Sequence, residues 1–153
     1  MNTFTDAQLE LADSVGKIRQ RRAKQNSYGR GHGESGYQLS RHVIGARAEL
    51  AFALVRDLKW PNDENEFGTG FGDFDGVQVR GTTHNTGKLI IFESEMRQML
   101  FVLVVVNDNR YRIAGSIQGE DGWNLGFVPS SFLRAGSPAQ RWVDQKHLSN
   151  DFF

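Results

Sequence analysis

Apolar residues in the first part of the chain recur at every third or fourth position, which is the spacing that buries one face of an α-helix. One such segment covers residues 6–24 and follows Thr5, which is suited to cap its N-terminus. A second segment covers residues 41–58 and follows Ser40, another capping residue, while Pro61 excludes further helix beyond it. The pattern therefore predicts two successive helices in this part of the chain.

Beyond Gly72 the apolar residues alternate with polar ones, which is typical of β-strands that bury one face. The run from Leu100 to Val106 is apolar throughout, so we expect a central strand that is buried on both faces. Asp75-Gly76 is a strong signal for a tight hairpin turn. Together these signals predict strands at 71–74, 77–83, 88–92, 100–106 and 110–117, a loop or single helical turn at 93–99, and a short helix at 128–133.

Two segments lack either periodicity and are expected to form loops. Residues 26–40 are rich in glycine and serine, and we expect them to be mobile. The stretch from Gly31 to Gly36 matches G-x-G-x-x-G, but it follows a helix, whereas the dinucleotide-binding fingerprint follows a strand. That interpretation is therefore rejected. Residues 62–72 are acidic and glycine-rich and predict a second loop.

The order of these elements predicts one domain over residues 1–153, in which residues 1–39 form a basic N-terminal helix and its mobile loop. The expected fold class is α/β or α+β, with a mixed β-sheet packed by the N-terminal helices. The chain has no cysteine, which excludes disulfides, thiolate metal sites and cysteine nucleophiles. Its longest apolar run is far shorter than the ~20 residues of a membrane helix. We therefore expect no membrane partner and a cytoplasmic location.

The formal net charge is zero, but the charges are unevenly distributed along the chain. Basic residues predominate between positions 17 and 47, and acidic residues gather between positions 57 and 75. This separation suits a polyanion held beside a cation site, although a basic run is more commonly a solvated helix face. On the first interpretation, the residues expected to contact nucleic-acid phosphates are Arg19, Arg21, Arg22, Lys24, Arg30 and Arg41.

Four polar residues are candidates for a chemical site. Glu49 lies among small and apolar residues of the second predicted helix, where a buried carboxylate needs a counter-charge. Asp73 precedes the hairpin turn, and Gln78 and Arg80 are two positions apart on the next strand, so they share a face. An exposed helical glutamate and a solvent-facing strand are the ordinary alternatives. Asp75 is better explained by the turn itself.

The order of Glu49, Asp73 and the Gln78-Val79-Arg80 strand resembles the PD-(D/E)XK nuclease superfamily, in particular its small phage-encoded members. The resemblance covers roughly residues 44–117. It implies a restriction-endonuclease-like core and Mg²⁺-dependent (or Mn²⁺-dependent) hydrolysis of DNA phosphodiesters in a phage-infected host cytoplasm. By position, Glu49, Asp73 and Gln78 would hold the metal, and Arg80 would occupy the place of the usual lysine.

This sequence departs from the superfamily pattern at both positions of its motif strand. Gln78 replaces an acidic residue, which lowers the charge available to a metal, and Arg80 cannot serve as a proton-transferring base. The resemblance therefore predicts an endonuclease, with structured or branched DNA among its candidate substrates. It leaves open an inactive relative that binds nucleic acid or a host protein. The aromatic residues Trp142, Phe152 and Phe153 suit either a core or a homodimer contact.

Overall fold

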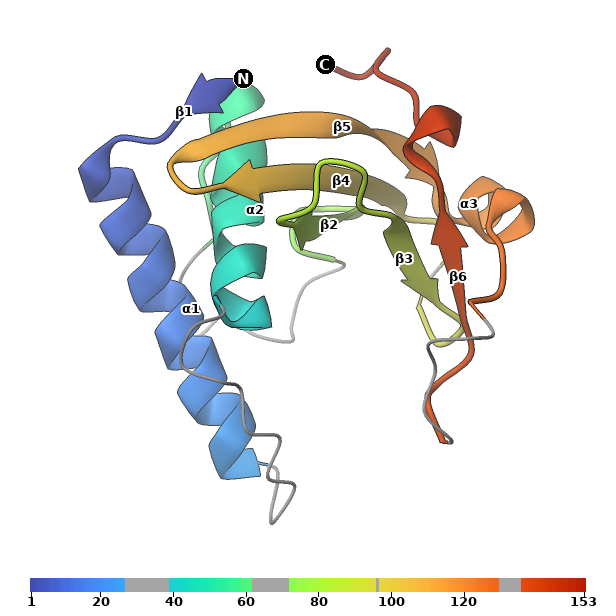
Figure 1. The fold of residues 1–153 in the computed structure, drawn as a ribbon, viewed down its shortest axis with the longest axis horizontal. Coiled ribbons are helices and arrows are strands. Elements are labelled where there is room, and N and C mark those ends of the chain that lie inside the picture. The colour runs from blue at the N-terminus through green and yellow to red at the C-terminus, as the bar shows by residue number, and fades with distance from the viewer. Residues whose placement is uncertain (27–38, 62–71, 96, 130–135) are drawn as a thin grey trace.

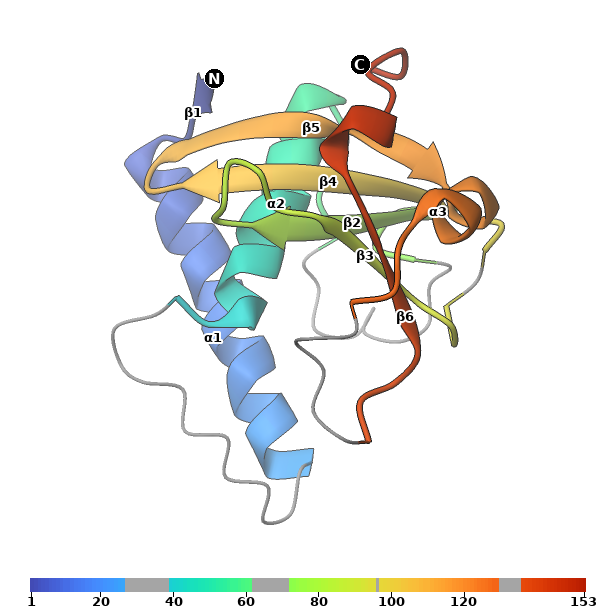
Figure 2. The same ribbon diagram turned by 45° about the vertical axis from the view of Figure 1, so that its right-hand side comes forward.

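The computed structural model describes residues 1–26, 39–61, 72–95, 97–129 and 136–153. Two helices lie on one side of a four-stranded sheet, and a two-stranded sheet with a third helix lies on the other (Figures 1 and 2). The expectation of a mixed sheet packed by N-terminal helices is confirmed at this level.

Helices α1 (Asp6–Asn26) and α2 (Arg41–Val55) begin where the capping residues predict. The Thr5 hydroxyl accepts from the Gln8 amide at 3.2 Å while the Gln8 side chain accepts from the Thr5 amide at 2.8 Å, which is a capping box. The Ser40 hydroxyl accepts from the backbone amide of Val43 at 3.1 Å. Each cap satisfies amide donors that the first helical turn would leave without partners.

Helix α2 ends earlier than the periodicity predicts. Asp57 adopts a left-handed backbone conformation (φ 50°), and the Leu58 amide donates back to the Ala53 carbonyl at 2.8 Å. This is the bond of a Schellman motif, which closes a helix at its C-terminus. The predicted extension to residue 58 is therefore wrong, because a local backbone reversal ends the helix before Pro61 does.

The main sheet has the strand order β1-β5-β4-β2. Its strands are β1 (Asn2–Thr3), β5 (Arg110–Gln118), β4 (Leu100–Asn107) and β2 (Val77–Thr82). β4 pairs with β5 in antiparallel and with β2 in parallel orientation, so the sheet is mixed and β2 lies at its edge among the described strands. The Asp75-Gly76 turn leads into β2 as predicted, with reciprocal backbone bonds between Phe74 and Val77.

The second sheet pairs β3 (Leu89–Phe92) with β6 (Gln140–Val143) in antiparallel orientation. Its strands run steeply across those of the main sheet (Figure 2), and α3 (Gly119–Leu125) and the short 3-10 helix η2 (Gln145–His147) lie beside it. No helix was predicted at α3. Most of the helix predicted at 128–133, and of the loops predicted at 26–40 and 62–72, lies outside the described residues.

Two apolar cores meet on β4. Val102, Val104 and Val106 pack against the helices, whereas Phe101, Leu103 and Val105 pack toward β3 and β6. β4 is therefore a central strand buried on both faces, as its uninterrupted apolar sequence predicts. Within the described residues, no helix has both the length and the apolar character required to span a lipid bilayer.

Close contact between α2 and β2 depends on small residues. A Cβ atom at Gly81 would lie 2.8 Å from the Ile44 carbonyl oxygen and 2.9 Å from the Ala48 Cβ, so a larger residue does not fit there. This close approach brings the inner face of α2 to the free edge of the main sheet, where the candidate site residues lie.

Candidate functional site

Asp73 is held at the outer edge of β2. Its Oδ2 accepts from the backbone amide of Val79 at 2.7 Å and from the Gln78 side-chain amide at 2.7 Å. Because β2 has no partner strand on this side among the described strands, the Val79 amide points outward and the carboxylate takes the place of a neighbouring strand. The turn before β2 therefore fixes a carboxylate at the sheet edge.

Glu49 approaches the same region from α2. Only 7% of its surface is exposed. Its two carboxylate oxygens accept from the Arg19 guanidinium at 2.6 and 2.8 Å, and Trp60 Nε1 donates to Oε2 at 3.1 Å. A buried carboxylate requires such partners, so Glu49 is held by α1 on one side and by the segment after α2 on the other.

Asp73 lies within the electrostatic reach of Glu49. The pKa of Asp73 is raised to about 6, first by burial and second by the charge of Glu49. The Val79 amide, Arg80 and Arg19 oppose the shift, in that order. Glu49, Asp73, Arg19 and Arg80 thus form one charged cluster, which we call the edge cluster.

Arg80 belongs to the edge cluster but lies on the face of the sheet that is turned away from α2. Val79 packs in the helix-side core, so strand alternation directs Gln78 and Arg80 to the other face, as the sequence predicts. Arg80 forms an ion pair with Glu95, which follows β3 and also accepts from the Phe92 amide at 2.9 Å. Burial lowers the pKa of Arg80, and the charge of Asp73 opposes this. Among the described residues, Arg80 Nε is buried without a hydrogen-bond partner.

The structure thus brings together the four predicted site residues and adds three that sequence reasoning missed. The additional residues are Trp60, Glu95 and Arg19, the last in its role as the partner of Glu49. Their separations in sequence leave no local signal that could have identified them. Asp75 lies in the turn and is exposed, in agreement with its structural interpretation.

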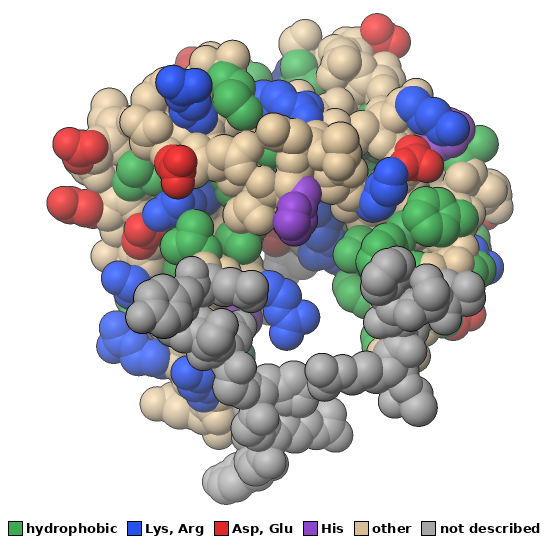
Figure 3. Space-filling model, viewed as in Figure 1, with side chains coloured by type: hydrophobic (Ala, Val, Ile, Leu, Met, Phe, Trp, Pro, Cys, Tyr) green, Lys and Arg blue, Asp and Glu red, His purple; other side chains and the backbone are tan. Residues whose placement is uncertain are grey.

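The basic residues expected to contact phosphate divide into inner and outer positions. The Arg19 side chain is 13% exposed and turned toward Glu49, which differs from the outward position that the sequence predicts. Arg21, Lys24 and Arg41 are exposed, and Arg22 is half-buried. Arg30 lies outside the described residues. Figure 3 shows Lys and Arg side chains gathered over the second half of α1, beside a hollow between the helices and the β3–β6 sheet.

The donor chemistry of the edge cluster fits a hard divalent cation. Mg²⁺ needs only one or two carboxylates because it retains several water ligands, and Glu49 and Asp73 supply two. The pKa of Asp73 is raised first by burial and second by the charge of Glu49, so a bound cation would stabilise its ionised form. Among the described residues, however, no group of three or more His, Cys, Asp or Glu side chains is placed to hold an ion. The described site therefore offers a minimal, two-carboxylate ligand set.

Comparison of the chain with models of protein families, with curated proteins and with solved structures finds no significant match.

Proposed function

We propose that this protein binds DNA and hydrolyses its phosphodiester bonds with the aid of Mg²⁺ or Mn²⁺, on a restriction-endonuclease-like core. The observation that carries the proposal is the placement of two carboxylates, Glu49 and Asp73, at the edge of β2, where the charge of Glu49 contributes to the raised pKa of Asp73. A buried and a half-buried carboxylate of like charge form an arrangement that a divalent cation stabilises. The parallel pairing of β2 with β4, covered by α2, supports such a core.

Glu49 and Asp73 would hold the cation, and the Gln78 carboxamide oxygen would complete the protein ligands. When bound, the cation supplies charge stabilisation for a phosphoryl oxygen and a more acidic water molecule. In the described structure the Gln78 amide group instead donates to Asp73, so ligation through the Gln78 oxygen requires rotation of its amide.

Arg80 stabilises negative charge and transfers no proton, because a guanidinium stays protonated at ordinary pH. Its ion pair with Glu95 and its interaction with Asp73 fix the guanidinium beside the carboxylates. Arg19 is the second cation of the site. A divalent ion bound to Glu49 would compete with Arg19 for that carboxylate.

Cleavage of supercoiled and branched DNA in Mg²⁺ and in Mn²⁺ tests the proposal. Asp73→Asn and Glu49→Gln preserve side-chain shape and should abolish cleavage, whereas Asp121→Asn, an exposed acid on α3, should leave it unchanged. If wild type and Asp73→Asn show the same activity on every substrate, catalysis at the edge cluster is excluded.

A second candidate is a non-catalytic protein on the same core that binds nucleic acid or a host protein. It is favoured by the pairing of each charged group in the edge cluster: Glu49 with Arg19, Arg80 with Glu95, and Asp73 with amide donors. Calorimetric titration with Mg²⁺ separates the two candidates. DNA binding in EDTA, without metal uptake or cleavage, would support the second.

A further inference from the structure

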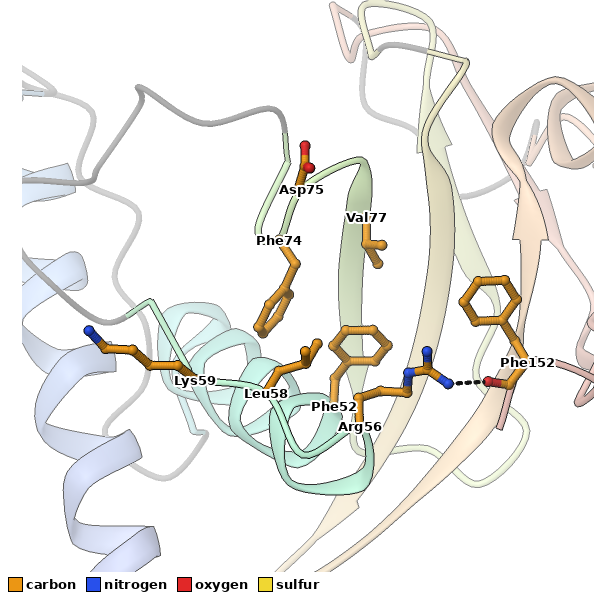
Figure 4. Close-up of a pocket in the computed structure, with 8 residues that line it drawn as sticks. All are labelled: Phe52, Arg56, Leu58, Lys59, Phe74, Asp75, Val77 and Phe152. Atoms are coloured by element: carbon orange, nitrogen blue, oxygen red, sulfur yellow. Dashed lines mark hydrogen bonds between the residues drawn. The ribbon is translucent and has the colours of Figure 1, made fainter.

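A pocket of about 300 Å³ opens beside the edge cluster, between the end of α2 and the start of β2 (Figure 4). Phe52, Phe74 and Val77 form its apolar side, and Phe152 stands opposite them with Arg56 between. This volume is at the lower end of the range for ligand pockets, roughly 300–1,000 Å³, and suits a single small ring system.

The pocket combines a fixed wall with an open one. Phe52 is 2% exposed, and its ring lies 4.9 Å from that of Phe74. Phe152 is 49% exposed, yet it is held in position because Arg56 donates to its carbonyl oxygen at 2.7 Å and lies 5.2 Å from its ring centroid. An exposed aromatic face of this kind gains stability when a planar apolar group covers it.

Two separate elements connect the pocket to the edge cluster. On α2, Glu49 and Phe52 are three positions apart and therefore lie on neighbouring turns of one helix face. In the hairpin, Asp73 is followed directly by Phe74. Each element thus contributes one acid to the cluster and one aromatic ring to the pocket. The cluster and the pocket are therefore joined through neighbouring residues of both elements.

The charges around the pocket favour an anionic ligand over a purely apolar one. Its lining holds two cations, Arg56 and Lys59, against one acid, Asp75, and the Lys59 side chain extends away from the aromatic rings (Figure 4). Aromatic faces for a base and cations for its phosphates are the features of surfaces that bind single-stranded nucleic acid. An apolar peptide side chain would use the rings but not these cations.

We propose that this pocket holds one nucleobase of a DNA strand whose phosphate would lie on the divalent cation held by Glu49 and Asp73. The proposal rests on the proposed function and specifies its substrate: the strand must present an unpaired or unstacked base, as single-stranded or branched DNA does. Base–aromatic stacking accepts any base, so the pocket would impose structure preference rather than sequence preference.

Fluorescence anisotropy with a labelled single-stranded oligonucleotide, in EDTA and in Ca²⁺, tests the pocket. Phe152→Ala should weaken binding between about fivefold and a hundredfold, which is the range for loss of one base–aromatic contact. Phe152→Leu should lose less. Phe127→Ala is the matched control, because Phe127 is 44% exposed and lies away from the pocket beside Trp142.

Oligonucleotides that lack one base, placed at each position in turn, provide the second arm. At one position, removal of the base should cost the wild type as much affinity as the Phe152→Ala substitution costs with the complete oligonucleotide. Phe152→Ala should bind the oligonucleotide that lacks this base as tightly as the complete one. Equal DNA binding by Phe152→Ala and wild type would overturn the proposed role of the pocket and would leave the proposed role of the edge cluster unaffected. A dimer that Phe152→Ala disrupts, with DNA affinity unchanged, would assign the pocket to a second copy and equally overturn the proposal. Failure of the proposed function is distinguishable from failure of the pocket, because it would appear in a metal titration done without DNA. In that titration the protein would take up no metal.

Discussion

Two buried ion pairs join α1 to α2, and they have opposite polarity. In the first, Arg47 of α2 donates to Asp13 of α1 at 2.7 and 2.8 Å, and also to the Asp108 carbonyl oxygen at 3.1 Å. In the second, Arg19 of α1 donates to Glu49 of α2 at 2.6 and 2.8 Å. Both are bidentate, which is the strongest geometry for an arginine–carboxylate pair.

The difference between the pairs lies in what surrounds the carboxylate. Asp13 and Arg47 form a bidentate pair, and the guanidinium uses a third bond to link the β4–β5 turn to the helices. Glu49 has a second carboxylate, Asp73, close enough to raise the pKa of that neighbour. We propose that the first pair serves the fold alone, whereas the second is also part of a site where a cation would compete. The predictions below test this distinction.

The largest expected effect is that of Arg47→Met. Removing the arginine leaves Asp13 without its counter-charge and removes the link to Asp108. Breaking a buried pair in this way typically costs about 3–5 kcal/mol, and the partial exposure of Asp13 places the expected loss at about 3 kcal/mol. Urea denaturation measures it, and Mg²⁺ should not restore the lost stability. Restoration by Mg²⁺ would contradict a purely structural role.

Arg19→Met should also destabilise the protein in EDTA, by about 2–3 kcal/mol, because Glu49 then loses its bidentate counter-charge and, within the described residues, keeps the bond from Trp60 alone. In contrast to Arg47→Met, Mg²⁺ should recover much of this loss. A ligand present at about 100 times its Kd stabilises by roughly 2.7 kcal/mol. The same denaturation experiment with and without Mg²⁺ provides the measurement. An equal response of both variants to Mg²⁺ would remove the distinction between the pairs.

Asp73→Asn should stabilise the protein at pH 8 by about 2 kcal/mol, with little effect near pH 4. Because the pKa of Asp73 is raised to about 6 in the folded state, its contribution to stability is present below its unfolded pKa of 3.8 and is lost as the pH rises through about 6. Asparagine stays neutral and avoids that loss. Denaturation across this pH range tests it, with Asp13→Asn as a contrast that should destabilise at pH 8.

The smallest expected effect concerns the outer face of α1. If exposed Arg21 contacts a DNA phosphate, Arg21→Gln should weaken duplex binding several-fold and reduce the salt slope by about 0.9. Arg41→Gln should behave similarly, because Arg41 is also exposed. Binding measured over a salt series gives the slope. Unchanged slopes for both variants would place the DNA-binding surface elsewhere.

Much of the fold could be predicted from local patterns. The caps at Thr5 and Ser40, the Asp75-Gly76 turn and the apolar run of β4 depend on neighbouring residues, so their signals lie within a few positions of the sequence. Helix α3 was not predicted, because its seven residues are too few to show helical periodicity. The early end of α2 depends on the backbone conformation of Asp57, which no hydrophobic pattern records.

The candidate site shows the same division. The sequence by itself determined that Gln78 and Arg80 share a face of β2 and that Glu49 lies among apolar neighbours, because strand alternation and helix spacing follow from backbone geometry. Only the tertiary structure decided that Arg19 turns inward to Glu49, that Glu95 pairs with Arg80, and that Glu49 lies near enough to Asp73 to raise its pKa. These contacts join side chains from different elements, and their geometry arises only when α1, α2 and β2 pack together.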